Sequence, residues 1–287
     1  MFNAKHAPLA CLVVAAGTLI SAQTPLSPDA VALRSHYAMQ ALDRYLETWN
    51  SREPLRWAGS LHYPHVRPSP GEFAISKTPE EYAAGVDFGQ TLKTGWHHSE
   101  WDTRRVLQVG SDKVHVSGQW TRYTAEGKPL AGSVITYIVT EHAGRWGVLS
   151  RFAAGPTLTD AARVASVGPA ALAALKAHAD AWNSHNAEGL AGTLNYPYVR
   201  IADGGVDVSS TPADFLRGAE PGRQRTWFET RIEQTEVVQV STAGVNITFK
   251  YSRRGRDGAA MSSYEALALV TNRGGTWKVQ AISSFGP

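Results

Sequence analysis

The sequence of 287 residues contains a single cysteine, Cys11. A chain with one thiol forms no internal disulfide, so packing must supply its stability. The sequence also lacks an apolar run of transmembrane length. The longest mostly apolar run, Leu9–Ile20, covers twelve residues, whereas a spanning helix needs about twenty. We therefore expect no membrane span.

The sequence also has little net charge and lacks the common cofactor-binding motifs. The formal net charge is only +3, and the densest basic cluster, Arg253-Arg254-Gly255-Arg256, is typical of a solvated hairpin turn. The sequence has no glycine-rich phosphate loop, no Gly-x-Ser-x-Gly elbow and no His-Glu-x-x-His helix. We therefore predict no nucleic-acid partner, no cofactor and no metal site.

The first 22 residues have the pattern of a signal peptide. Lys5 supplies a positive charge, the apolar run follows it, and Ser21-Ala22 offers small residues for cleavage. Cys11 lies inside the apolar run, which is a poor lipoprotein pattern. The sequence therefore predicts an exported protein, periplasmic or secreted, whose mature form has no thiol.

One stretch of the sequence occurs twice. Trp49-Asn50-Ser51 is followed by Tyr63-Pro64-His65-Val66-Arg67, and 133 residues later Trp182-Asn183-Ser184 is followed by Tyr196-Pro197-Tyr198-Val199-Arg200. Later matches, among them Trp146 with Trp277, keep an offset of 131 to the end of the chain. A correspondence of this length predicts a tandem duplication.

Each copy begins with helices and continues with strands. A long amphipathic helix should start after Ser27, a short one should cover Glu53–Leu61, and a third should be capped by Thr78. Pro64 in the strand that follows the short helix favours a sheet edge or a bulge. Alternation and turn residues then predict four further strands, which are 96–109, 113–123, 132–141 and 145–152.

The order of elements is α+β in each copy, with helices packed in a curved antiparallel sheet. We place a first domain at 27–156, a linker at 157–168 and a second domain from Pro169 to 287. The helix ending in Trp-Asn-Ser, the Tyr-Pro-x-Val-Arg strand and the terminal strand resemble the nuclear-transport-factor-2-like, or SnoaL-like, superfamily. That resemblance implies two cone-shaped domains, which we expect to pair within the chain as homodimeric relatives do.

The resemblance gives no mechanism, because the superfamily includes both enzymes and domains that only bind. Where its steroid isomerases would place a proton-abstracting Asp, this sequence has Arg67-Pro68 in one copy and Arg200-Ile201 in the other. The dehydratase and epoxide hydrolase patterns are not found either.

The candidate site residues come from the repeated strand. Because side chains alternate along a strand, Tyr63, His65 and Arg67 should share one face, and Val66 should point to the other. The second copy offers the same row, in which the ligand-binding candidates are Tyr196, Tyr198 and Arg200. The alternative is structural: the arginines would pair with carboxylates and the tyrosines would pack.

Histidines and tryptophans differ between the copies. Copy one has five histidines at positions where copy two has other residues, and His65 is the best placed as a general base. Tryptophans that recur in register are typical of core. Trp57, Trp101 and Trp120 have no tryptophan counterpart and are better ligand-binding candidates.

Two functions remain open from the sequence. The first is a non-enzymatic protein whose cones bind a small, partly apolar molecule. The second is a cofactor-free lyase, isomerase or hydrolase that uses the first domain, with His65 as base and Tyr63 and Arg67 orienting the substrate.

Overall fold

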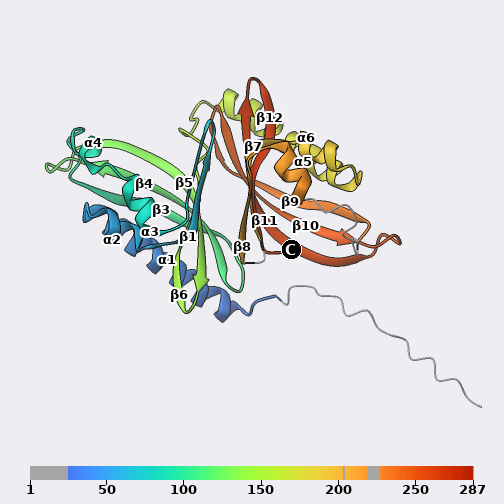
Figure 1. Cartoon of the computed structure of the whole chain (residues 1–287), viewed down its shortest axis with the longest axis horizontal. Helices are drawn as coiled ribbons and strands as arrows, with labels where there is room; N and C mark the ends of the chain where they lie inside the picture. The colour runs from blue at the N-terminus through green and yellow to red at the C-terminus, as the bar shows by residue number, and fades with distance from the viewer. Residues whose placement is uncertain (1–24, 203, 219–226, 287) are drawn as a thin grey trace, which may run out of the picture.

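The chain folds into two six-stranded sheets that have the same strand order (Figure 1). The structure is a computed structural model and describes residues 25–202, 204–218 and 227–286. The predicted signal peptide lies outside the described residues. In strand order, the sheets are β2-β1-β6-β5-β4-β3 and β8-β7-β12-β11-β10-β9. The repeated order confirms two copies of one α+β domain.

The first domain carries its helices before and beside the sheet. Its helices are α1 (Pro28–Asn50), α2 (Pro54–Ala58), α3 (Pro79–Ala84) and α4 (Phe88–Leu92). Its strands are β1 (Leu61–Ser69), β2 (Glu72–Ser76), β3 (His98–Val109), β4 (Lys113–Tyr123), β5 (Pro129–His142) and β6 (Arg145–Phe152).

The second domain repeats this plan. Its helices are α5 (Ala161–Asn183), α6 (Ala187–Gly192) and α7 (Pro212–Gly218). Its strands are β7 (Leu194–Ala202), β8 (Gly205–Ser209), β9 (Glu229–Val240), β10 (Gly244–Arg254), β11 (Ala260–Arg273) and β12 (Thr276–Ser284). In each domain the first strand pairs in parallel with the last, and the other neighbours are antiparallel.

Local sequence signals place the helix starts. The Ser27 hydroxyl accepts a hydrogen bond from the Ala30 amide at 3.2 Å, which confirms the predicted cap of α1. The Thr78 hydroxyl accepts from the Glu81 amide at 3.2 Å at the start of α3. In the second copy Thr211 caps α7 in the same way, through the Asp214 amide at 3.1 Å. All three caps satisfy amides that the helix itself leaves unpaired.

Of the two alternatives that Pro64 predicts, a sheet edge and a bulge, the structure has the second. β1 runs between β2 and β6, and the register of β1 against β6 shifts between Leu61 and Val66. The predicted linker is partly helical, because α5 begins at Ala161 and continues through Pro169. Asp160 caps this longer helix. The helix tolerates the loss of the one backbone hydrogen bond that Pro169 cannot donate.

The repeated Trp-Asn-Ser segment ties each long helix to its sheet. The Asn50 side chain bonds both backbone groups of Ser99 at 2.9 Å, and the Asn183 side chain bonds both backbone groups of Thr230 at 2.8 Å. The Ser99 hydroxyl also accepts the indole N–H groups of Trp49 and Trp96. The motif therefore fixes the end of the long helix against the start of a strand.

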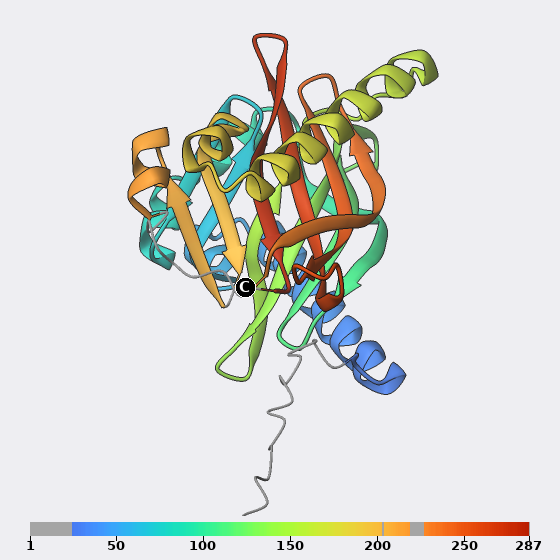
Figure 2. The same ribbon diagram turned by 90° about the vertical axis from the view of Figure 1, so that its right-hand side faces the viewer.

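The two sheets pack against each other, and the helices lie on their outer sides (Figures 1 and 2). An apolar cluster drawn from both sheets fills the interface. Its fully or almost fully buried members are Val66, Ile138, Leu149, Phe152, Ala154, Val199, Ile201, Leu267, Leu269 and Ala281. Val66 and Val199 thus point away from the cone interiors, as the alternation along each strand predicts.

Polar contacts complete this interface. The Asn246 amide donates to the Thr136 hydroxyl and to the Phe152 carbonyl, both at 3.0 Å. The His115 imidazole lies between Gln108 of its own domain and Ser283 of the other, at 2.8 Å from each. These contacts match the expected pairing of the two domains within the chain. Among the described helices, none is long and apolar enough to cross a membrane.

Candidate functional site

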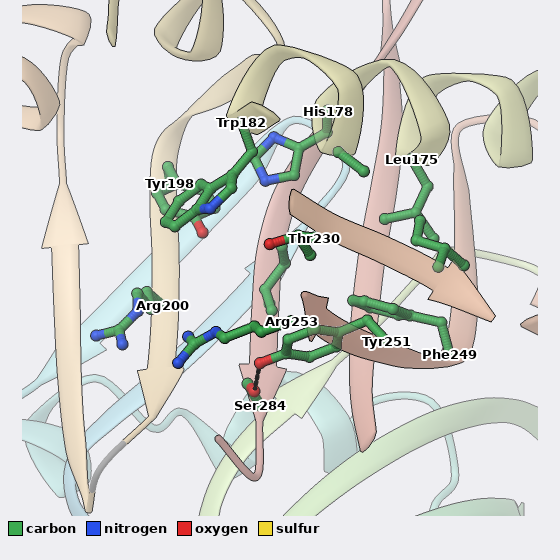
Figure 3. A pocket seen from close by; sticks show the side chains of 13 residues that line it. Leu175, His178, Trp182, Tyr198, Arg200, Thr230, Phe249, Tyr251, Arg253 and Ser284 are labelled. Carbon is green, nitrogen blue, oxygen red and sulfur yellow. Dashed lines mark hydrogen bonds between the residues drawn. The ribbon is translucent and has the colours of Figure 1, made fainter. Parts of the chain in front are cut away.

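The second cone contains a pocket of about 100 Å³ between α5 and the sheet (Figure 3). Side chains from one helix and four strands line it. They are Leu175, His178, Ala179, Trp182, Tyr198, Arg200, Thr230, Ile232, Phe249, Tyr251, Arg253, Ile282 and Ser284. A space of this size holds several waters or a small organic group.

The charged groups of the pocket are two arginines. Arg200 of β7 donates from Nη1 to the Asp207 carboxylate at 3.1 Å. Arg253 of β10 has its Cζ 3.8 Å from the Trp227 ring centroid, so the guanidinium lies against an aromatic face. Neither Asp nor Glu occurs among the described residues that line the pocket, and the Asp207 carboxylate that pairs with Arg200 lies outside this lining.

His178 presents a neutral imidazole to the pocket. Its Nδ1 lies 2.8 Å from the Thr193 hydroxyl, which itself donates to the Leu190 carbonyl at 2.7 Å. The Thr193 oxygen therefore accepts, and the proton of the imidazole is on Nδ1, which leaves the Nε2 lone pair available. Burial lowers the pKa of His178 to about 4, so the ring stays uncharged at neutral pH.

Two phenols add polar atoms to the apolar wall. Burial raises the pKa of Tyr198 and of Tyr251, so both hydroxyls remain protonated. The Tyr251 hydroxyl is hydrogen-bonded to the Ser284 hydroxyl at 2.8 Å (Figure 3). The pocket thus combines hydrogen-bond donors and two cations with a mostly hydrophobic surface, a composition typical of small-molecule sites.

The offsets of the repeat show why this cone is open. Ile232 of β9 stands where the first domain has Trp101, and Ala268 of β11 stands where it has Tyr137. In the first cone these two rings contact each other, with centroids 5.5 Å apart, and they cover Gly118. Smaller side chains at both positions leave space in the second cone, and Phe249, which stands at the place of Gly118, occupies part of it and lines the pocket.

The structure places the predicted first-domain row on the cone side of β1. His65 is 1% exposed, its Nδ1 lies 3.2 Å from the Val148 carbonyl, and its ring meets Tyr82 edge to face at 5.2 Å. The Tyr63 hydroxyl donates to the Ala58 carbonyl at 2.9 Å. Arg67 stacks over Tyr82 at 5.3 Å. The shared face agrees with the alternation, and His65 is enclosed by protein.

The three tryptophans that the sequence offers as ligand-binding candidates pack in the wall and core of the first cone. Trp57 is 5% exposed and packs against Trp49 with ring centroids 4.5 Å apart. Trp120 lies 5.2 Å from the Arg122 Cζ, and Trp101 is partly buried beside the same core. In this structure all three pack on protein side chains.

Of the second-domain candidates, Tyr198 and Arg200 line the pocket. Tyr196 is hydrogen-bonded to the Ala191 carbonyl at 3.1 Å and packs in the core. Sequence reasoning missed His178, Trp182, Tyr251 and Arg253 as site residues. Alternation carried the signal for the last two, because Phe249, Tyr251 and Arg253 recur at every second position of β10 and face one side.

No group of three or more potential metal ligands occurs among the residues that the structure describes. The comparisons with known proteins concern the fold. Residues 35–156 match the family model described as "NTF2-like protein (DUF6841)". No curated protein sequence matches the chain.

Several solved structures resemble one domain of this chain. A protein of unknown function with a cystatin-like fold from Nostoc punctiforme is 17% identical and covers 45% of this chain and 96% of its own, with a TM-score of 0.37. An NTF2-like protein of unknown function from Shewanella oneidensis is 15% identical, with coverages of 42% and 98% and a TM-score of 0.35. An NTF2-like protein from Novosphingobium aromaticivorans is 15% identical, with coverages of 47% and 88% and a TM-score of 0.38.

Proposed function

We propose that this chain, which consists of two NTF2-like domains, binds a small amphipathic anion in the pocket of its second domain. The observation that carries the proposal is the composition of the pocket: an apolar wall, two arginines and no acidic side chain among the described lining residues. A ring or short chain that bears a carboxylate matches this surface, because its apolar part can contact the wall and its carboxylate can bind the arginines.

The positions of the polar groups support this ligand class. Arg200 and Arg253 come from β7 and β10, and Figure 3 shows both reaching toward the same side of the pocket, while Leu175 and Phe249 lie toward the other. A carboxylate can take two parallel hydrogen bonds from a guanidinium, which orients the ligand as well as holding it. The apolar part of the ligand then contacts the side chains of α5 and β10.

The same support does not extend to the cofactor-free lyase, isomerase or hydrolase in the first domain. His65 would be its base, and that imidazole is buried with its Nδ1 against a backbone carbonyl. Burial and the neighbouring Arg151 and Arg67 hold the pKa of His65 well below its usual range. We therefore propose binding, and we also propose export, which rests on residues 1–22 of the sequence alone.

A matched pair of ligands tests the proposal. Benzoate and benzamide have the same ring and differ in charge, so titration calorimetry with the purified chain should show tighter binding of benzoate. Arg200→Gln should weaken benzoate binding about tenfold or more, since a hydrogen bond to a charged group contributes about 1.5–3 kcal/mol.

Arg56→Gln is the control, because Arg56 is a half-exposed residue of the first domain that pairs with Glu47. It should leave the benzoate affinity unchanged. Equal binding of benzamide, or an Arg200→Gln variant that binds benzoate as well as the parent chain does, would refute an anion site in this pocket.

A further inference from the structure

The first cone holds a partly buried arginine where the second cone holds an apolar residue. Arg151 of β6 and Ile282 of β12 occupy the same place in the repeat. The other arginine positions of the pocket recur in both cones: Arg67 corresponds to Arg200, and Arg122 to Arg253. The first cone therefore carries one cation more than the second at its centre.

The hydrogen-bond partners of Arg151 are neutral. Its Nη1 donates to the Tyr45 hydroxyl at 2.7 Å, and its Nη2 donates to the Tyr82 hydroxyl at 3.4 Å. Its Cζ also lies 5.7 Å from the Trp57 ring centroid. Burial raises the pKa of Tyr45 to about 12, so that phenol remains protonated and supplies no negative charge. The Arg151 Nε is buried without a partner.

A second guanidinium faces the same space. Arg67 stacks on the Tyr82 ring that Arg151 reaches through the hydroxyl. Burial, and then the charge of Arg151, lower the pKa of Arg67. No ion pair joins either arginine to a carboxylate of the described residues. The Glu72 carboxylate acts on Arg67 electrostatically without forming an ion pair with it. Two partly buried cations without an ion pair are costly, since a buried charge needs compensation.

Further unpartnered polar atoms belong to the same cluster. The Trp57 Nε1, the His65 Nε2 and the Tyr137 hydroxyl are buried and make no hydrogen bond. Ring contacts join these side chains to the tyrosines: Trp57 and Tyr137 each lie 5.7 Å from Tyr45 between centroids. The Trp57 Nε1–H and the Arg151 Nε–H are therefore buried donors without an acceptor, whereas the His65 Nε2 carries a lone pair, because its Nδ1–H donates to the Val148 carbonyl.

We propose that the first domain binds a compact carboxylate between Arg151 and Arg67. The two guanidinium groups supply charge and paired N–H donors. The phenols of Tyr45 and Tyr82 accept from Arg151, so their own O–H groups remain to donate to the anion. Both arginine residues are intermediate in exposure, so neither is completely removed from solvent.

This site is separate from the pocket of the second domain and does not depend on it. Both cones have arginines at the same two repeat positions. The first cone has a third, Arg151, at the place of Ile282, and its apolar space is filled by Trp57, Trp101 and Tyr137. The first cone therefore suits a ligand that is mostly charge, and the second suits a ligand with an apolar body.

Thermal unfolding in sodium acetate tests the proposal. The melting temperature of the full chain should rise saturably with acetate and not with sodium chloride at the same concentration, because a ligand that binds only the folded state stabilises it. Arg151→Ile introduces the residue that the repeat already accepts at this place. It should weaken acetate binding about tenfold or more and flatten the rise.

Two variants separate this site from its alternatives. Arg151→Lys keeps the charge and loses the planar fork, so it should retain only part of the acetate response. Arg253→Gln alters the second pocket and should leave the response intact. A parent chain with no acetate-specific rise, or an Arg151→Ile variant whose rise is unchanged, would overturn the proposal; a response lost in Arg253→Gln alone would place acetate in the second domain instead.

Discussion

The buried imidazole of His178 should make the second domain sensitive to acid. His178 is 8% exposed, and its Nδ1–H is held by the Thr193 hydroxyl. Burial lowers its pKa from 6.5 to about 4 in the folded protein. The unfolded chain therefore binds a proton at this residue at a pH where the folded protein does not, and acid favours unfolding.

The magnitude follows from the two pKa values. Each pKa unit corresponds to about 1.4 kcal/mol, so the difference between 6.5 and about 4 amounts to about 3 kcal/mol. The folded pKa is the lower one, so this contribution is fully present above pH 6.5. It is lost progressively as the pH falls from 6.5 toward 4.

Urea unfolding of the parent chain and of His178→Gln at pH 7.5, 5.5 and 4.5 measures this contribution. Glutamine does not titrate, so the free energy of unfolding of the variant should fall less with acid, by about 3 kcal/mol over this range at most. His36→Gln removes an exposed histidine and is the control. Parallel pH profiles for the parent chain and His178→Gln would refute the reasoning.

Two further predictions concern the packing of the first domain. Gly118→Ala should lower the free energy of unfolding by about 1–3 kcal/mol, because a Cβ there would lie 2.9 Å from Trp101 and 3.0 Å from Tyr137; Gly192→Ala, which meets nothing within 4 Å, is the control in the same urea assay. Ser99→Ala should lower the free energy of unfolding by about 3 kcal/mol, since it leaves two indole N–H groups without their acceptor. Ser166→Ala, at an exposed serine, should lower it much less in the same assay, and equal losses for the two variants would contradict this account.

The fold was accessible from sequence because its signals are local and occur twice. Caps such as Ser27 and Thr78 depend on side chains within three residues, and the alternation along β1 places Val66 and His65 on opposite faces whatever lies beyond them. The start of α5 is harder to predict, because Pro169, where the sequence places the start of the second domain, lies inside the helix. The cap is Asp160, nine residues earlier, and proline at 169 gives no signal for it.

The site was less accessible, because the histidines that distinguish the first copy have structural partners. His115 bridges the two domains, and His62 lies 2.8 Å from the Thr140 hydroxyl. Residue type shows that an imidazole is present, but its accessibility depends on residues distant in sequence. His178 has a plain helical spacing and no motif, and it becomes a pocket residue only because α5 lies over β9 and β12.

Side-chain volume at a few positions sets the space inside each cone. Trp57, Trp101 and Tyr137 in the first cone correspond to Leu190, Ile232 and Ala268 in the second, and each of these exchanges removes an aromatic ring from the interior, whereas the exchange of Gly118 for Phe249 adds one. Backbone and strand order are the same, so the repeat alone predicts equal pockets.

The cone with the larger side chains also carries the additional charge. Arg151 belongs to the first cone, and Ile282 takes its place in the second cone, where the side chains at the compared positions are smaller. Duplication has thus left one scaffold with two interiors, one aromatic and cationic, the other apolar with a cationic side. The difference between the two proposed sites follows from these exchanges, and the Trp-Asn-Ser segment that reveals the repeat anchors the helix in both domains.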